Sequence, residues 1–318
     1  MINSVRNTVL TVLNKNNYGY ISPSDFNLMA KQAQMEVFEE YFADYNDTIN
    51  RENVRPSNAP SAIVLASNSG YADKKKGIEE AIEIFSATKF LAHSSGNLFF
   101  LPSLTTTGDD YYLLNKVLCY PVLLASGNNT SVLLNSLVDA GANFVALGVA
   151  PGDVVTNTTT GATAIATVVT ATTITLSADI FTAFPEGYSV FDESVVNEAE
   201  KVSHSKITML NNSLLTSPTI HFPAYTQESD LMSVFPRAIN TKGQIQCQYI
   251  RYPKDPKWTY VSLTNGEPSF DQSQLDYQDF ELPLEDEPKL VYKILQLAGL
   301  SIREAGVVAG AKAEEQEL

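Results

Sequence analysis

One stretch of this chain, residues 117–200, contains no Lys, Arg or His. This absence of basic residues limits the structures that the stretch can form. Its only charged residues are acidic, namely Asp139, Asp153, Asp179, Glu186, Asp192, Glu193, Glu198 and Glu200. Its middle, VAPGDVVTNTTTGATAIATVVTATTITLSADIF, is rich in β-branched residues, which favour strands, and Pro151-Gly152-Asp153 is typical of a turn. We therefore predict a small β-module over residues 128–192, inserted into a host domain.

The N-terminal region, residues 1–57, has the spacing of amphipathic helices. A first helix is predicted from Ile2, Val5, Val9 and Leu13, and Asn14 to Gly19 is expected to break it. Ser22-Pro23-Ser24-Asp25 is typical of a second helix start, with Ser22 as N-cap and Pro23 in the first turn. An apolar stripe then follows at helical spacing: Phe26, Met29, Ala33, Val37, Tyr41 and Tyr45.

The host domain is predicted from short strands on either side of the module, over residues 58–127 and 193–280. These strands are GNLFFLP, DYYLLNKVLCYPVLL, LMSVFP, GQIQCQYIRYP and KWTYVSL. We expect a helix over about 193–211, and another that begins at Asp286 or Glu287 and is capped by Gly299. Residues 281–318 then form a C-terminal helix and an extended arm. The predicted fold class is α+β.

The titratable residues do not form a recognisable catalytic or metal-binding motif. Cys119 and Cys247 are far apart and are expected to be buried, reduced thiols. His93, His204 and His221 are isolated, so no metal site is predicted from them. The sequence also lacks a phosphate-binding glycine loop and a G-x-S-x-G turn. We therefore expect no enzymatic activity, no metal and no cofactor.

Charge and hydropathy limit the classes of partner that this protein is expected to bind. The formal net charge is −15, from 36 acidic and 21 basic residues, so the surface repels the phosphates of nucleic acid. We expect DNA to pass such a surface without tight binding. No apolar run approaches the roughly 18 residues of a membrane-spanning helix, and the N-terminus does not resemble a signal peptide. No membrane partner is expected.

The segment RYPKDPKWTY, residues 251–260, combines three basic residues with the only Trp of the chain. It can be a proline-rigid turn whose Trp258 packs on the core. It can also be an anchor for a neighbouring subunit, since Arg, Tyr and Trp dominate interface hot spots, or a stacking platform for single-stranded nucleic acid. For contacts between subunits we predict Phe38, Tyr41, Tyr45, Arg251, Trp258, Ile302 and Arg303.

Two passages resemble a known family. They are VLTVLNKNNYGYISPSDFNLMAKQAQMEVFEEYFADYN near the N-terminus, and YIRYPKDPKWTY with DFELPLEDEPKLVYKILQLAGLSIREAGVV near the C-terminus. Both are similar to virion structural proteins of crAss-like and related tailed bacteriophages that infect Bacteroidetes, and with the residues around them they cover about half of the chain. The inserted module departs from that pattern.

The resemblance implies a homo-oligomeric ring, with twelve as the usual copy number, in the virion neck or tail below the portal. Its neighbours would be portal, ring or tail proteins, and it would assemble in the cytoplasm of the host bacterium. DNA and ejected proteins would pass through an acidic lumen. Two alternatives remain open: a peripheral tail or fibre component that contacts host glycans through the module, and a tail hydrolase that degrades cell-wall sugar with paired carboxylates.

Overall fold

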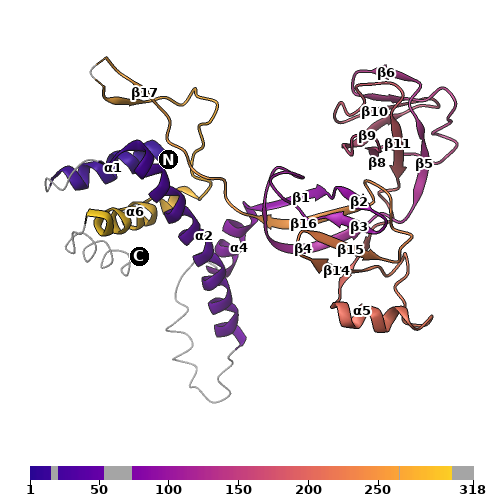
Figure 1. Cartoon of the computed structure of the whole chain (residues 1–318), viewed down its shortest axis with the longest axis horizontal. Helices are drawn as coiled ribbons and strands as arrows, with labels where there is room; N and C mark the ends of the chain where they lie inside the picture. The colour runs from indigo at the N-terminus through magenta and orange to yellow at the C-terminus, as the bar shows by residue number, and fades with distance from the viewer. Residues whose placement is uncertain (16–20, 54–73, 265, 303–318) are drawn as a thin grey trace. The chain divides into compact units, whose positions relative to one another are not determined.

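The computed structural model describes residues 1–15, 21–53, 74–264 and 266–302, and it confirms the α+β class (Figure 1). The chain divides into two compact units. The first, which we call the helical unit, combines residues 1–85 with 253–318, and the second, the β unit, comprises residues 86–252. Residues 253–280, which we predicted to lie with the host strands, therefore belong with the helices.

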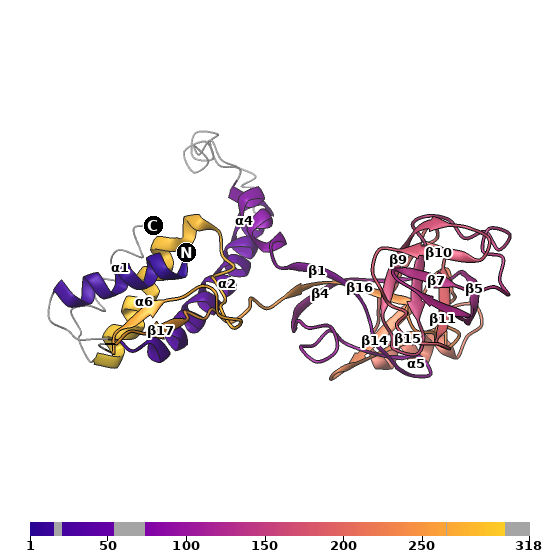
Figure 2. The same ribbon diagram turned by 90° about the horizontal axis from the view of Figure 1, so that it is seen from above.

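Four α-helices lie in the described part of the helical unit, and α6 packs against both α1 and α2 (Figure 2). Their bounds are α1 (Ile2–Lys15), α2 (Pro23–Asn53), α4 (Lys74–Glu83) and α6 (Glu287–Ile302), the last preceded by the short 3-10 helix η1 (Leu284–Asp286). α2 begins as predicted, because the Ser22 hydroxyl accepts the Asp25 amide at 3.1 Å. The apolar stripe of α2 faces inward, with Phe26, Ala33 and Val37 buried. Among the described residues the unit also contains one small hairpin, β17 (Tyr260–Ser262) and β18 (Pro268–Phe270).

A buried lysine joins α2 to α6. The Nζ atom of Lys293 on α6 lies 2.6 Å from Glu40 Oε1 and 3.6 Å from Glu36 Oε2 on α2. Lys289, one turn earlier, lies 2.6 Å from the other oxygen of Glu40. Lys293 is buried, whereas the two glutamates are partly exposed to water. The charge of Lys293 therefore needs these two partners for its stabilisation more than the charges of the glutamates need Lys293.

Replacing Lys293 with methionine should lower the free energy of unfolding of the helical unit by about 1–3 kcal/mol. Methionine keeps the apolar stem but removes one of the two cations that lie 2.6 Å from Glu40 and the cation beside Glu36. The control is Lys31→Met, which removes an exposed pair with Asp255 and should cost less than about 1 kcal/mol. Denaturant unfolding measures both variants, and equal losses would contradict the bridging role of Lys293.

Asp279 holds the start of α1. Its carboxylate accepts hydrogen bonds from the Met1 amino group at 3.0 Å, from the Ile2 amide at 2.7 Å and from the Phe280 amide at 2.8 Å. Burial raises the pKa of Asp279, but these hydrogen bonds outweigh it and hold the pKa below its ordinary value. The ionised carboxylate is therefore the form that the folded chain favours.

This lowered pKa predicts an acid-dependent loss of stability. A carboxyl whose pKa is lower in the folded state stabilises the fold above its unfolded value, about 3.9, and loses that contribution as the pH falls through the folded value. We expect Asp279→Asn to be less stable than the original chain at about pH 7, with the difference shrinking below about pH 4. Unfolding measured across that range checks this, and a difference that is independent of pH would contradict it.

The β unit contains two sheets that belong to the host. One has the strand order β1-β16-β4-β12 and the other β13-β14-β15-β3-β2. The bounds are β1 (Ser86–Phe90), β2 (His93–Ser95), β3 (Leu98–Phe100), β4 (Tyr111–Cys119), β12 (Asn197–Glu198), β13 (Glu200–Lys201), β14 (Ala224–Glu228), β15 (Leu231–Phe235) and β16 (Ile245–Arg251). Phe99, Val117, Met232 and Tyr249 lie in the shared core between them.

The basic-free stretch forms a sheet of its own, which we call the module. Its strand order is β5-β11-β8-β9-β10-β7-β6, with bounds β5 (Leu123–Asn128), β6 (Ser131–Leu133), β7 (Ser136–Val138), β8 (Val154–Asn157), β9 (Thr163–Val169), β10 (Thr173–Leu176) and β11 (Gly187–Phe191). It starts at Leu123 rather than at 128, because β5 pairs with β11. Leu137, Phe144, Phe181 and Tyr188 fill its core, so it has its own hydrophobic interior.

Two predicted helical features are wrong. Of the helix expected over 193–211, only α5 (His204–Asn211) forms, with Ser203 as its N-cap. The residues before it are drawn into β12 and β13, which pair with β4 and β14. Gly299 does not cap the C-terminal helix, because α6 continues to Ile302.

Candidate functional site

Three of the residues predicted to contact other subunits are buried within the helical unit. Phe38 is fully buried, Trp258 is 2% exposed and Tyr41 is 8% exposed. The Tyr41 hydroxyl donates to Asp286, and burial together with that carboxylate raises its pKa. These side chains stabilise one subunit and are not available to a neighbour, so their assignment to the interface is corrected.

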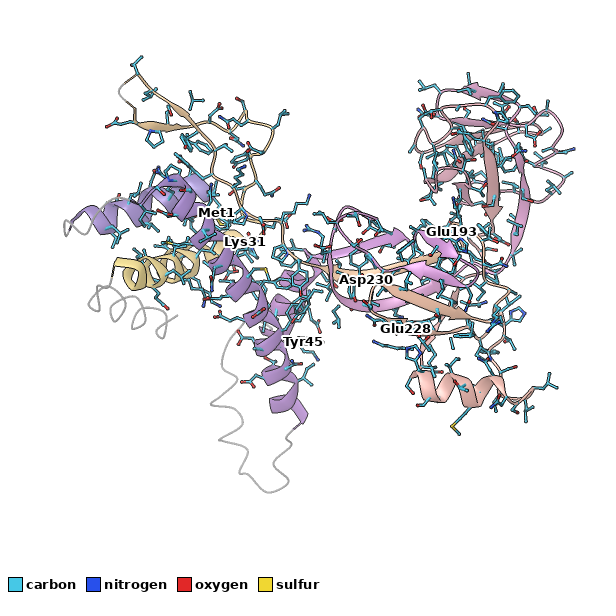
Figure 3. All side chains as sticks on the ribbon, viewed as in Figure 1. Met1, Lys31, Tyr45, Glu193, Glu228 and Asp230 are labelled. Atoms are coloured by element: carbon cyan, nitrogen blue, oxygen red, sulfur yellow. The ribbon has the colours of Figure 1, made fainter. Side chains whose placement is uncertain are left out.

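Of the other four predicted contact residues, two lie outside the core, and the side chains of the remaining two are not among those that the structure describes. Tyr45 is half-buried on α2 and donates to Glu79 Oε1 on α4 at 3.2 Å (Figure 3). Arg251 is partly buried at the end of β16, and its guanidinium donates to the Tyr252 carbonyl at 3.2 Å. The side chain of Ile302 and all of Arg303 lie outside the described residues. Of the five predicted residues whose side chains are described, three are core residues, so these five do not form one exposed surface.

Trp258 is the centre of an aromatic cluster. Its ring stacks on Tyr260 and Phe270, with centroid separations of 5.6 and 5.9 Å. The Arg6 guanidinium lies 3.8 Å from the ring centroid, and the indole N–H donates to Asn3 Oδ1 at 3.1 Å. Trp258 thus packs on the core of the helical unit, as one of our interpretations predicted, but residues 252–256 are irregular chain and not the turn that the same interpretation expected.

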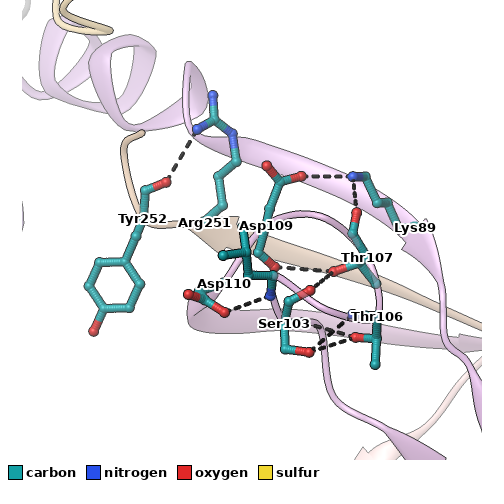
Figure 4. Close-up of polar contacts among 9 residues, drawn as sticks. Lys89, Ser103, Thr106, Thr107, Asp109, Asp110, Arg251 and Tyr252 are labelled. Atoms are coloured by element: carbon teal, nitrogen blue, oxygen red, sulfur yellow. Dashed lines mark hydrogen bonds and ion pairs between the residues drawn. The ribbon is translucent and has the colours of Figure 1, made fainter. Parts of the chain in front are cut away.

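A polar loop between β3 and β4 is closed by its own contacts (Figure 4). Lys89 Nζ on β1 lies 2.7 Å from Asp109 Oδ2 and 2.5 Å from the Thr107 carbonyl. The Ser103 hydroxyl bonds Thr106 Oγ1 at 2.8 Å, and Asp110 Oδ1 accepts the Leu104 amide at 2.7 Å. Each polar group has a partner inside the loop or on β1, so the arrangement braces the sheet rather than presenting donors to a ligand.

The thiols and histidines are placed as structural residues. Cys119 and Cys247 are buried and free, as predicted, and burial raises the pKa of each to about 12, so both stay protonated at neutral pH. His93 bonds the Gly96 carbonyl at 2.8 Å, and His204 lies 3.2 Å from Glu228. Within the described ranges no three His, Cys, Asp or Glu residues gather closely enough to hold a metal ion.

One cleft of about 440 Å³ lies where the module meets residues 192–194. Two of its three carboxylates are engaged, because Asp153 accepts the Ala150 amide at 2.8 Å and Asp192 accepts the Ser194 amide at 2.8 Å. They hold two turns in place. The lining residues are Gly148, Ala150, Pro151, Asp153, Asp192, Glu193 and Ser194.

The module presents few aromatic rings to solvent. Phe144, Phe181, Tyr188 and Phe191 are buried, whereas Phe184 is mostly exposed. A glycan-binding surface usually offers several aromatic faces for sugars to stack on. Among these five aromatic residues, Phe184 is the one that remains for such a role.

Several strongly exposed apolar side chains lie on α5 and in the residues after it. Leu214 and Leu215 are fully exposed, and Phe222 and Met209 are about as open, at 81% and 73%. We call these four residues the α5 patch. They follow one another over a short stretch, beside the buried anchor Ile207 that attaches α5 to β14. Sequence reasoning missed this patch, although a Leu-Leu pair in a loop rich in Ser, Thr and Pro was a visible signal.

A second apolar surface lies at the edge of the module. β6 is the last strand of its sheet, and Val132, Leu133 and Leu134 are 48%, 55% and 74% exposed. We call these three residues the β6 patch.

No protein-family model and no curated protein sequence matches this chain. In the part of the chain that the structure describes, no helix combines the length and apolar character needed to cross a membrane. The function therefore has to be argued from the residues themselves and from the sequence resemblance given above.

Proposed function

We propose that this chain is a structural subunit of a tailed-phage virion, which assembles with copies of itself into a ring in the neck or tail below the portal. The observation that carries the proposal is the α5 patch, where Leu214, Leu215 and Phe222 stand almost entirely in solvent. The sequence resemblance of the N- and C-terminal passages supplies the place in the virion.

The free energy gained when the exposed side chains of the α5 patch are buried favours assembly. Burying one leucine or phenylalanine side chain contributes about 1.5–3 kcal/mol relative to leaving it in water. Four exposed apolar side chains within residues 209–222 therefore favour association, and aromatic and apolar anchors at the centre of a contact dominate its energy. A subunit that assembles with its own copies would bury this patch in the contact between subunits.

The charge supports a conduit. The net charge of −15 repels the phosphates of DNA, and the module contributes acids without any base. A ring wall of this composition would let DNA and ejected proteins pass without adhering to it. In this role the chain needs no catalytic residue, metal or cofactor.

Replacing Leu214 and Leu215 with aspartate should raise the protein concentration needed for assembly more than tenfold. The reason is that two apolar side chains, which the proposed contact would remove from water, become charged. Sedimentation of the full chain at several concentrations measures this. The matched control is Leu275→Asp, since Leu275 is also fully exposed but belongs to the helical unit. The proposal fails if the double variant assembles as the original chain does.

A further inference from the structure

We infer that the module is a movable body, which a latch on the host holds closed. The latch is the host turn of residues 240–244, which contacts the module through Lys242 and Gly243. This inference goes beyond assembly, because it concerns two parts of one β unit and applies to a single copy as well as to a ring.

The module and the host have separate interiors. Every buried member of the module's main core lies between Ala125 and Val190, and every buried member of the host core lies outside that range. Within the described chain, the module's sheet shares no strand with either host sheet. The chain enters the module at Val122 and leaves it at Asp192, and the Asp192 amide donates to the Val122 carbonyl at 3.0 Å. Two crossings that lie side by side can act as a hinge.

One face of the module's sheet lies against the host. On the neighbouring strands β8 and β11, Ser189 stands opposite Thr156 and Phe191 stands opposite Val154. The residues between them point into the module's own core, because successive side chains of a strand alternate between its two faces. Phe191 and Val154 form a small apolar cluster with Tyr120 of the host. This contact holds the module closed without merging the two cores.

The polar half of the same contact is poorly satisfied. Thr156 is fully buried beside Gly243, and its Oγ1 atom has no hydrogen-bond partner among the residues that the structure describes. The Ser189 hydroxyl donates to the Lys242 carbonyl at 3.5 Å, which is long for a bond between two oxygens. A buried hydroxyl without a partner costs free energy, and water would supply that partner when the contact opens. The closed state therefore carries a penalty that opening relieves.

Lys242 supplies the charged part of the latch. Its Nζ atom donates to the Thr158 carbonyl at 2.6 Å and to the Thr159 carbonyl at 3.4 Å. Each side of this contact is shaped within its own body. In the host turn, Gln244 Oε1 accepts two backbone amides at 3.1 and 3.2 Å. In the module loop, Asn157 Oδ1 accepts two amides at 2.9 and 3.1 Å. The latch can therefore open and close without rebuilding either side.

The reactivity of a thiol placed under the latch tests the inference on the full chain. Thr156→Cys introduces a side chain of nearly the same size, which reacts with a soluble maleimide when the module swings away. Adding Lys242→Met should raise the labelling rate by about tenfold or more, because a charged hydrogen bond that closes the contact is lost. The matched control is Lys116→Met, which removes an exposed host lysine paired with Glu198 and should leave the rate unchanged.

A thiol in the module core distinguishes movement from unfolding. Ile174 is fully buried in that core, and labelling of Ile174→Cys should stay slow when Lys242→Met is added. The chain without an added thiol gives the background of Cys119 and Cys247, which are buried. A labelling rate at position 156 that Lys242→Met does not change overturns the inference. An equal acceleration at position 174 also overturns it, since the module would then unfold rather than move.

Hydrogen exchange reads the same movement in Lys242→Met without an added thiol. The host turn of residues 240–244 should exchange faster than in the original chain, while β9 and β10 keep their protection. Exchange of the turn at the original rate overturns the inference.

Discussion

Replacing Trp258 with alanine is expected to lower the free energy of unfolding of the helical unit by about 3–5 kcal/mol. The ring is 2% exposed and stacks on Tyr260 and Phe270. Its backbone amide donates to Asn27 Oδ1 at 2.8 Å, which ties the segment to α2. Alanine would leave a cavity and would remove the surface over which the Arg6 guanidinium lies.

Denaturant unfolding of the full chain, followed by far-UV circular dichroism, measures the loss. Tyr260→Ala is the control, because Tyr260 belongs to the same stack but is 41% exposed, and it should cost no more than about 1.5 kcal/mol. Stability unchanged by Trp258→Ala, together with lost assembly, would instead restore the residue to the interface between subunits.

Gly243→Ala is expected to destabilise the β unit by about 2–4 kcal/mol or to prevent its folding. Gly243 has φ +78°, which L side chains rarely adopt, and an added Cβ would lie 1.8 Å from Oγ1 and 2.7 Å from Cβ of Thr156. Thr156 is fully buried on β8 of the module, so it has little room to move. The neighbouring Lys242 donates to the Thr158 carbonyl at 2.6 Å, which holds the host turn against the module.

The matched control is Gly161→Ala, also in the β unit. Gly161 has a similar φ of +86°, but an added Cβ meets nothing within 4 Å, so only the backbone strain of about 1–2 kcal/mol remains. Thermal unfolding of the two variants separates strain from collision. Equal shifts in melting temperature would mean that the host turn does not pack on the module as closely as described.

Local signals predicted where α1, α2 and α6 begin, but α4 was not predicted. Ser22 caps α2 as expected, because a cap depends on residues within one turn of each other. The helix predicted over 193–211 failed for the opposite reason. Val195, Val196, Ala199 and Val202 have helical spacing, but β12 and β13 form by pairing with strands far away in the sequence, and that pairing leaves no local mark.

The candidate site was harder to predict than the fold. Aromatic residues such as Phe38 and Trp258 are enriched both in cores and at interfaces, because both remove apolar surface from water, and composition cannot separate the two. The α5 patch was missed because Leu214 and Leu215 lie in a loop, where no periodicity distinguishes an exposed residue from a buried one.

The molar mass of the purified full-length chain in solution tests the assembly claim most directly. Light scattering across a wide concentration range should give one closed species whose mass is an integer multiple of 34.8 kDa, with about twelve copies expected from a ring near a portal. A chain that stays at the mass of a single copy at every concentration would contradict the account.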